Sequence, residues 1–307
     1  MILSVIIPTY NRVGKLEKCI ESLSGQSLAN EMFEIIVIDN ASTDTTREVI
    51  YRILPLIKNL SYIYESTPGL NEARNRGLKE ARGLYIAYLD DDTVTHKYWA
   101  EKIVEAFSNV IPQPGVVGGP VLPVWEGDKP YWLTKRFEGA VSMINYGSQK
   151  RFLQGRDFLV GANMAFLKAA LVQIGGFLPG LDRKGSKLLS GGDIAAIEKI
   201  KKLTYQVYYD PDISVDHYIS TERLNHEWFI KRSYWEGYSE ALMWRMLDKP
   251  SLIAWSKKLI YYIYGFLRNP GHIFYLLRSV KEPELFWFKC MVHARVGYLA
   301  GLVSLNK

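Results

Sequence analysis

The most informative stretch of the sequence is Leu84-Tyr85-Ile86-Ala87-Tyr88-Leu89-Asp90-Asp91-Asp92-Thr93. Its first six residues form an apolar run with the length of a strand buried on both faces. The three carboxylates therefore follow the carboxyl end of a strand, where ligand crevices form in open α/β sheets. Asp90 and Asp92 can reach one divalent cation, which prefers oxygen ligands. We predict a metal site for a diphosphate ligand here; the alternative is a solvated turn that caps the next helix.

Three apolar stretches of strand length precede this one, at residues 3–7, 33–38 and 60–64. A helical pattern follows each, and the apolar face of the first helix carries Leu16, Cys19, Ile20 and Leu23. Alternating strands and helices predict an α/β fold with a mainly parallel sheet flanked by helices. Asp39 ends the second strand and would lie at the same sheet edge as the three carboxylates. Two acidic strand ends suggest a nucleotide pocket, although Asp39 and Asp44 could instead cap the next helix, as could Ser42 or Thr43.

Composition places the chain among folded proteins. Its 307 residues are 48% hydrophobic and 13% aromatic, enough for a substantial core. Cys19 and Cys290 lie in apolar helical patterns at opposite ends of the chain, so we expect two buried, reduced thiols. Met1 leads directly into a predicted strand without the basic and apolar regions of a secretory signal. We therefore expect a cytoplasmic protein.

Four motifs occur in a fixed order along the chain. They are Val5-Ile6-Ile7-Pro8-Thr9-Tyr10-Asn11-Arg12, Asp39-Asn40-Ala41-Ser42-Thr43-Asp44, Asn71-Glu72-Ala73-Arg74-Asn75-Arg76-Gly77 and Leu89-Asp90-Asp91-Asp92. This series resembles the signature of family 2 glycosyltransferases with the GT-A fold, and the resemblance covers roughly the first seventy per cent of the chain. It implies a nucleotide-sugar donor, a divalent metal and inversion at the anomeric carbon.

Carried over position by position, the resemblance implies a nucleotide site. Its members would be Pro8, Thr9, Tyr10, Arg12, Asp39, Arg74, Asp90 and Asp91. Asp39 and the loop before Asn11 would hold the nucleoside, with a UDP-sugar favoured as donor. Asp92 would bind Mn²⁺ or Mg²⁺, and His217, predicted to follow the last sheet strand, would be a further ligand or a diphosphate contact. A structural role is the alternative for His217, and pairing with Glu72 or a neighbouring acid is the alternative for Arg74.

The resemblance also implies a catalytic base and a sugar pocket. Asp193, before a predicted helix with Ile194, Ile197 and Ile200, would be the general base, with an N-cap role as the alternative. The family commonly has Glu-Asp here, whereas this chain has Gly192 in the Glu position. The sugar or acceptor pocket would include Gly161, Ala162, Asn163 and Gly192. A strand with a glycine bulge is the alternative for the segment at residues 158–166.

The last third of the chain differs from the rest. Residues 222–307 hold 13 Lys and Arg against 7 Asp and Glu, so they carry the whole net charge of +6. Long helical patterns rich in aromatic residues begin here. We therefore divide the chain into a catalytic domain at 1–221 and a C-terminal α-helical region at 222–307. Its helices could lie on an anionic membrane surface, through residues 250–307, or pack on the catalytic domain or between two copies in a homo-oligomer.

These observations predict a metal-dependent, inverting glycosyltransferase of polysaccharide or glycolipid assembly, with a saccharide or lipid-linked acceptor. The apolar stretches of the tail are too short, or contain too many charged residues, for a membrane-spanning helix, so membrane contact would be peripheral, at the inner face. Nucleic-acid binding is not expected, because residues 1–221 hold equal numbers of basic and acidic side chains. The alternative is a non-catalytic, nucleotide-sugar-binding scaffold, which Gly192 alone supports.

Overall fold

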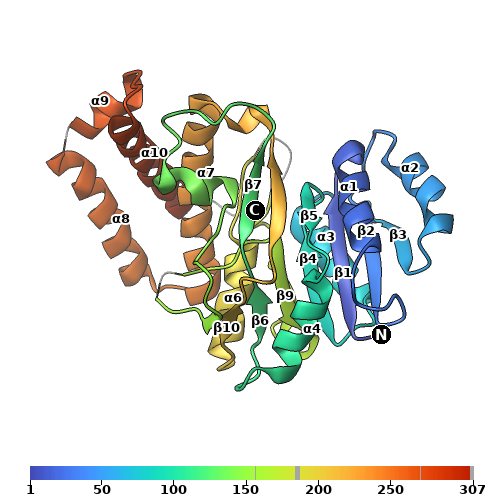
Figure 1. Cartoon of the computed structure of the whole chain (residues 1–307). Helices are drawn as coiled ribbons and strands as arrows, with labels where there is room; N and C mark the ends of the chain where they lie inside the picture. Colours follow the sequence, from blue (N-terminus) through green and yellow to red (C-terminus); the bar gives the residue numbers. More distant parts are fainter. Residues whose placement is uncertain (156, 184–186, 270, 305–307) are drawn as a thin grey trace. The chain divides into compact units, whose positions relative to one another are not determined.

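The computed structural model describes residues 1–155, 157–183, 187–269 and 271–304, and the chain divides into two compact units (Figure 1). The first unit comprises Met1–Val124, Ser142–Pro179 and Gly192–Tyr218. The second comprises Trp125–Val141, Gly180–Gly191 and Ile219–Lys307. The second unit thus includes two segments from the amino-terminal side of the predicted boundary at residue 221.

An eight-stranded sheet forms the centre of the first unit, in the order β3-β2-β1-β4-β9-β6-β10-β8. Its strands are β1 (Leu3–Thr9), β2 (Phe33–Asp39), β3 (Leu60–Tyr64), β4 (Tyr85–Leu89), β6 (Val116–Gly118), β8 (Arg151–Phe152), β9 (Asn163–Leu167) and β10 (Val207–Tyr209). Strands β3, β2, β1 and β4 are parallel to their neighbours, as are β6 and β10. Strand β9 runs antiparallel between β4 and β6, and β8 antiparallel to β10. The predicted α/β fold, mainly parallel with a C-terminal helical region, is confirmed.

A second sheet has the order β5-β11-β7; its strands are β5 (Thr93–Thr95), β7 (Val121–Trp125) and β11 (Val215–Ile219). The chain leaves the large sheet at Gly119 and Pro120, so the consecutive strands β6 and β7 belong to different sheets. A Cβ atom at Gly119 would overlap the carbonyl oxygens of Asp210 and Ile213. Strand β11 alternates between buried and half-buried residues, with Val215, His217 and Ile219 buried.

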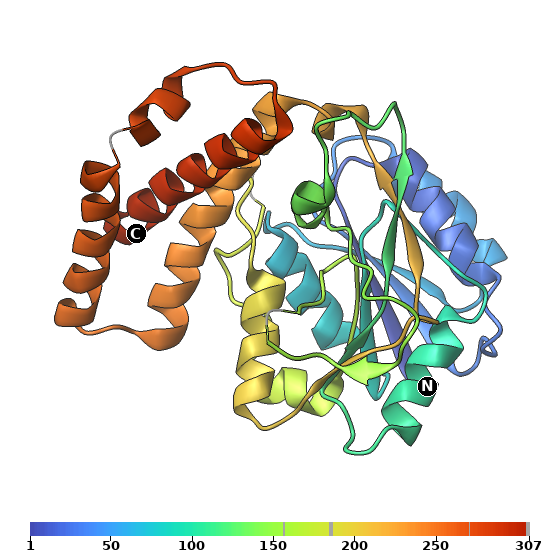
Figure 2. The ribbon, with the colours of Figure 1, turned by 60° about the vertical axis from the view of Figure 1, so that its left-hand side comes forward.

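Helices cover both faces of the large sheet, as Figures 1 and 2 show. On one face lie α1 (Val13–Ser24), α2 (Thr46–Ile53) and α4 (Trp99–Asn109); on the other lie α3 (Leu70–Glu80), α5 (Lys168–Gln173) and α6 (Gly192–Lys202). A short 3₁₀ turn, η1 (Leu54–Leu56), follows α2. All seven residues of β1 are buried, as expected for a strand covered on both faces. The four apolar residues predicted for the inner face of α1 are the four that it buries.

The second unit is helical. Its helices are α7 (His226–Asp248), α8 (Leu252–Arg268), α9 (Gly271–Leu277) and α10 (Pro283–Val303), with 3₁₀ turns η2 (Lys135–Val141) and η3 (Thr221–Arg223). Helices α7 and α10 approach closely where Gly237 and Gly297 lie. A Cβ atom at Gly237 would overlap the Ala294 carbonyl, and one at Gly297 would overlap the Tyr234 carbonyl, so a larger residue would push the helices apart. Cys290 in α10 is buried and free, as is Cys19 in α1, which confirms the prediction of two reduced thiols.

Candidate active site

The candidate site lies where parallel strands β1, β2 and β4 end. Thr9 and Asp39 are opposite each other in the register of β1 and β2, and β4 delivers Asp90 directly after Leu89. The sequence thus places a hydroxyl group and several carboxylates at one edge of the sheet, because carboxyl ends of parallel strands meet there. Pro8, one residue earlier in β1, is buried, whereas Tyr10 is exposed beyond the strand end.

Asp91 is buried and internally bonded. Thr9 Oγ1 donates a hydrogen bond of 2.8 Å to its Oδ2 atom, and Arg12 Nη1 lies 3.1 Å from its Oδ1 atom. Burial raises the pKa of Asp91 to about 6, although the Arg12 charge and the Thr9 hydrogen bond oppose that effect. Asp91 therefore anchors β1 and the first loop to the end of β4. Its predicted contact with the nucleotide stays a prediction.

Asp92 connects Arg12 with His217. Arg12 Nη1 lies 2.8 Å from Asp92 Oδ2, while Asp92 Oδ1 faces His217 Nε2 at 3.2 Å. Both Asp92 and His217 are buried. The structure corrects the position predicted for His217: the residue lies within β11, opposite Thr93 of β5, rather than after the last sheet strand. The backbone N–H of Tyr218 donates to the Asp92 carbonyl at 2.9 Å, which holds this register.

Asp90, Asp92 and His217 fit a divalent cation. Each offers one ligand atom, and the three atoms lie within 4.8 Å of one another. Within the part of the chain that the structure describes, neither ring nitrogen of the buried His217 makes a hydrogen bond. Ligands of one cation lie about 3 Å apart when each bond is about 2.1 Å, and the Asp92–His217 separation agrees with this value. These residues can therefore hold a metal ion.

Arg74 of α3 extends toward the same edge. Its Nη2 atom lies 3.9 Å from Asp90 Oδ1, and its guanidinium stacks on the Phe177 ring at 5.2 Å. A Cβ atom at residue 161 would overlap Nη2 of Arg74, so glycine here leaves the guanidinium in its place. The acid beside Arg74 is thus Asp90, which fits the alternative of a pair with a neighbouring acid as well as the predicted site. Arg74 places a buried positive charge beside the carboxylates.

Asp193 lies in the first turn of α6. Its Oδ2 atom accepts a hydrogen bond of 2.9 Å from the backbone N–H of Gly161, and its Oδ1 atom one of 2.9 Å from Ile194 N–H. A carboxylate in the first turn of a helix is stabilised by the positive end of the helix dipole. The Cβ position built at Gly161 is 3.3 Å from Asp193 Oδ2 and overlaps Arg74. The Asp193 carboxylate and the Arg74 guanidinium therefore both lie next to Gly161.

Gly192 has a packing role that the sequence did not reveal. A Cβ atom there would overlap the Asn71 side chain, which is fully buried and donates a 2.7 Å hydrogen bond to the Leu178 carbonyl. Glycine at this position therefore lets α6 approach α3. The place predicted for Gly192 in an acceptor pocket stays a prediction.

Asn163 and Ala162 are engaged in the interior. The Asn163 amide accepts from Trp99 Nε1 at 2.9 Å and donates to the carbonyls of Ile213, at 2.7 Å, and Pro120, at 3.2 Å. Ala162 packs in the core between the sheet and helices α1 and α4. These contacts hold the chain behind the site, and the predicted sugar contacts of both residues stay predictions.

Asp39 is buried at the end of β2. Ser42 N–H donates to its Oδ1 atom at 2.9 Å, and Tyr62 Oη to its Oδ2 atom at 2.6 Å. The bonds of Asp39 thus lie within the loop and toward β3, whereas at the start of α2 it is Asp44 that accepts the Thr46 N–H, at 3.0 Å. Burial, followed by the Asp39 hydrogen bond, raises the pKa of Tyr62 to about 12. Tyr62 is therefore a donor that fixes the Asp39 carboxylate.

Two asparagines that support the loops were not among the predicted site residues. Asn11 Oδ1 accepts the Thr43 N–H at 2.7 Å and so connects the loops after β1 and β2. Asn40 donates to the Thr67 carbonyl and accepts the Gly69 N–H, both at 2.7 Å, which connects the loops after β2 and β3. Asn11 has a positive φ of 53°, a conformation that asparagine tolerates better than most residues. The sequence did offer a signal for these two residues, since each asparagine follows closely on the end of a predicted strand.

Comparison with known proteins decides the family. The sequence profile described as Glycosyl transferase family 2 matches residues 4–175, more than half of the chain. The chain belongs to glycosyl transferase family 2. Two relatives of this family 2 glycosyltransferase come from Haloferax volcanii: the glucosyl-dolichyl phosphate glucuronosyltransferase, 25% identical over 100% of this chain and 98% of the relative, and glycosyltransferase AglE, 27% identical over 91% and 85%.

Solved structures agree on the fold of this family 2 glycosyltransferase. The mannosyltransferase PcManGT from Pyrobaculum calidifontis, in complex with GDP-Man and Mn²⁺, gives a TM-score of 0.62 at 17% identity, covering 98% of this chain and 87% of that one. S. aureus TarS 1-349 in complex with UDP gives 0.55 at 17% identity, covering 98% and 91%. These structures confirm the GT-A fold, and the family match with its glycosyltransferase relatives confirms the prediction of a glycosyltransferase enzyme.

Proposed function

We propose that the enzyme transfers a sugar, with inversion, from a nucleoside diphosphate sugar to a hydroxyl group of a lipid-linked or saccharide acceptor in polysaccharide or glycolipid assembly. The observation that carries this proposal is the convergence of Asp193 and the Asp90–Arg74 pair at Gly161. A base and a charged leaving-group site must be close together for a single displacement at one carbon.

In this reaction, the Asp193 carboxylate accepts the proton of the acceptor hydroxyl. The hydroxyl oxygen bonds to the anomeric carbon, and the bond from that carbon to the diphosphate oxygen breaks, with its electron pair leaving on the diphosphate. Backbone N–H groups of Gly161 and Ile194 orient the carboxylate, and each of its oxygens keeps a second lone pair for the proton. Arg74 provides positive charge near the diphosphate.

Asp92 and His217, with Asp90 directly or through water, would hold Mn²⁺ or Mg²⁺. When bound, such an ion supplies positive charge against the diphosphate leaving group. Asp39 would accept an N–H of the nucleobase, and Pro8, Thr9 and Tyr10 would line the nucleoside. A UDP-sugar is our favoured donor. Arg12 keeps Asp91 and Asp92 in place from the first loop.

The acceptor proposal follows from the relative that matches over nearly its whole length and whose name includes a dolichyl phosphate sugar. No helix among the described residues is long and apolar enough to cross a membrane. We propose that the enzyme acts as a peripheral protein at the cytoplasmic face of the membrane, which it contacts through residues 250–307. Contact between two copies through the same residues is the alternative, which the vesicle experiment below separates.

The test is transfer by the Asp193→Asn variant. Asparagine keeps the shape and can still accept one backbone N–H, but it cannot take the proton. We expect transfer to fall by about 10² to 10⁴-fold, with unchanged affinity for the nucleotide. Near-normal transfer by this variant would exclude Asp193 as the base. The scaffold alternative, in contrast, predicts nucleotide binding without transfer in the wild-type enzyme.

A further inference from the structure

Helix α8 has two faces of different character. Its inner face packs on α7 and α10: Trp255 Nε1 donates to the Leu302 carbonyl at 3.0 Å, and the Tyr262 ring stacks on Tyr298 at 4.3 Å. Lys258 lies 4.2 Å above the Trp244 ring. These contacts fix the rotation of α8 within the helical unit, and so they determine which side chains point outward.

The outward face of α8 is apolar and exposed. Its members are 44% to 84% exposed, and they are Leu252, Ile253, Ile260, Ile263, Tyr264 and Leu267. At 3.6 residues per turn these six fall within about 120° of the helix circumference. No residue of α8 is fully buried. A continuous stripe of this kind marks an interaction surface, whereas single exposed leucines need no explanation.

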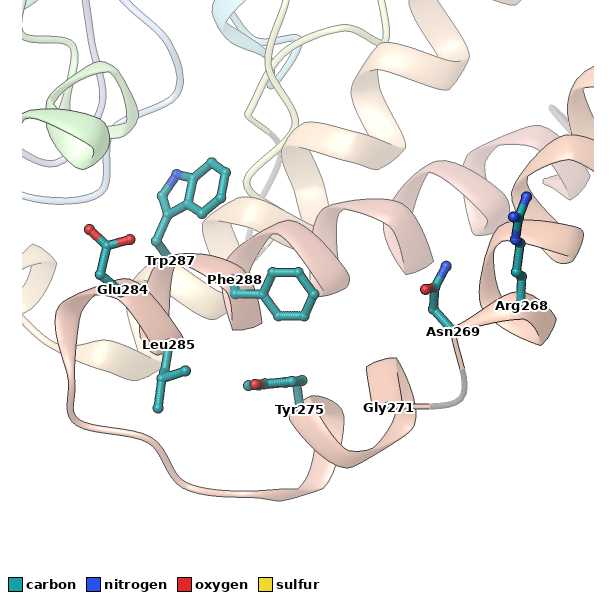
Figure 3. A pocket seen from close by; sticks show the side chains of 8 residues that line it. All are labelled: Arg268, Asn269, Gly271, Tyr275, Glu284, Leu285, Trp287 and Phe288. Atoms are coloured by element: carbon teal, nitrogen blue, oxygen red, sulfur yellow. The ribbon is translucent and has the colours of Figure 1, made fainter.

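Helix α9 also exposes apolar side chains. Tyr275 of α9 and Phe288 of α10 face each other at 4.7 Å beside a cavity of about 610 Å³, which the end of α8 also lines (Figure 3). Ile273, Phe274 and Leu277 are at least half exposed. Figure 2 shows α8 and α9 as consecutive helices in the helical unit. Together with the α8 stripe they form what we call the outer face of the unit.

The segment that carries the outer face is basic, between acidic flanks. Asp248 precedes it and Glu282 follows it, while Glu284, which lines the same cavity, pairs with Arg136 at 2.6 Å. Residues 249–281 contain Lys249, Lys257, Lys258, Arg268, Arg278 and Lys281, and no aspartate or glutamate. Lys257 and Arg268 are exposed and lie together along one edge of the apolar stripe on the helix circumference. Apolar side chains in the centre and basic side chains at the rim are the pattern of a helix that lies in a membrane interface.

We propose that the outer face of α8 and α9 binds the surface of an anionic lipid bilayer, with its apolar side chains in the acyl boundary and its basic rim among the headgroup phosphates. The charge decides between this occupant and a second copy of the chain. A two-fold interface would bring two basic rims together, and like charges oppose each other across an interface. An anionic bilayer neutralises the rim, because its headgroup phosphates attract each Lys or Arg near its surface.

The inference makes the proposed membrane contact specific, but its test does not depend on catalysis. The full-length protein is mixed with vesicles of phosphatidylcholine alone, or with about 30% phosphatidylglycerol, and the vesicles are floated through a density gradient. We expect flotation with the anionic vesicles only, and release as the salt concentration rises.

Three double variants are compared: Ile260→Glu/Leu267→Glu, Lys257→Glu/Arg268→Glu, and a control, Leu56→Glu/Leu84→Glu, at exposed leucines of the first unit.

The first two variants should each bind the anionic vesicles at least about tenfold less tightly, and the control should bind like the wild type. All six positions are exposed, so each variant should keep the wild-type thermal transition by circular dichroism. Nucleotide affinity should also be unchanged, so failure of this inference can be told apart from failure of the proposed function. Equal flotation of wild type and the Ile260→Glu/Leu267→Glu variant would overturn the proposal. A wild-type dimer that this variant converts to monomer, by light scattering, would also overturn it and assign the face to a second copy.

Discussion

Arg74 fills the space beside Gly161, where a Cβ atom would overlap its Nη2 atom. Gly161→Ala should therefore push the guanidinium away from Asp90 and disturb the N–H that Gly161 donates to Asp193. We expect nucleotide affinity to fall about tenfold and transfer to fall further, because both groups move. Calorimetry and a transfer assay measure the two effects. Gly265→Ala is the matched control, since nothing lies within 4 Å of its added methyl group; equal behaviour of the two variants would contradict this role of Gly161.

Gly192→Glu tests a substitution that restores the residue typical of the family. Because a side chain here overlaps Asn71, we expect a loss of about 1–3 kcal/mol in the free energy of unfolding, and lower transfer rather than higher. Urea unfolding of Gly192→Ala, Asn71→Ala and the double variant isolates the contact. The double variant should lose less than the sum of the two single losses. Strict additivity, or a Glu variant with full stability and raised transfer, would refute the packing role.

Glu34 links the amino-terminal ends of β1 and β2 with the loop after α3. Ser4 Oγ donates to it at 2.7 Å, as does the Arg82 N–H, and Arg82 Nε donates at 2.8 Å. Burial alone would raise the pKa of Glu34, but these hydrogen bonds outweigh it and lower the pKa below the ordinary 4.5. The unfolded chain therefore binds a proton first as the pH falls, so the Glu34 contribution is present above pH 4.5 and is lost as the pH drops through the folded-state pKa.

Glu34→Gln should lower the free energy of unfolding by about 1–3 kcal/mol at neutral pH, and the difference from wild type should shrink below pH 4.5. Chemical unfolding at a series of pH values measures this. Glu17→Gln is the control, because Glu17 forms an exposed pair with Arg52 at 3.3 Å and such pairs contribute little. A wild-type difference that stays constant from neutral pH to acid pH would contradict the assignment.

Local periodicity explains what the sequence predicted well. Fully apolar runs and the face of α1 depend on neighbours within a few residues, so β1, β2, β3, β4 and the buried side of α1 could be identified directly. The carboxylates at strand ends were found for the same reason, since a parallel sheet gathers its strand ends at one edge.

The features that could not be predicted from the sequence depend on contacts between residues far apart in the chain. Nothing in residues 163–167 indicates that β9 runs antiparallel between β4 and β6, or that His217 lies inside β11 opposite Thr93. The role of Gly161 depends on Arg74, 87 positions earlier, and that of Gly192 on Asn71, so neither glycine could be assigned a packing role from its own segment. Trp132 packs against Phe229 and Phe286, which only the fold brings together.

The central claim is that Asp92 helps to hold a metal ion on which donor binding depends. Calorimetric titration of UDP, GDP, dTDP and CDP, with Mn²⁺ and with EDTA, tests it on the wild type, Asp92→Asn, and Asp128→Asn as an exposed control. We predict that one nucleotide binds the wild type and the control at least about tenfold more tightly with Mn²⁺, and that Asp92→Asn loses this difference while keeping its thermal transition. Equal nucleotide affinity with and without Mn²⁺ in the wild type, or an undiminished metal effect in Asp92→Asn, would contradict it.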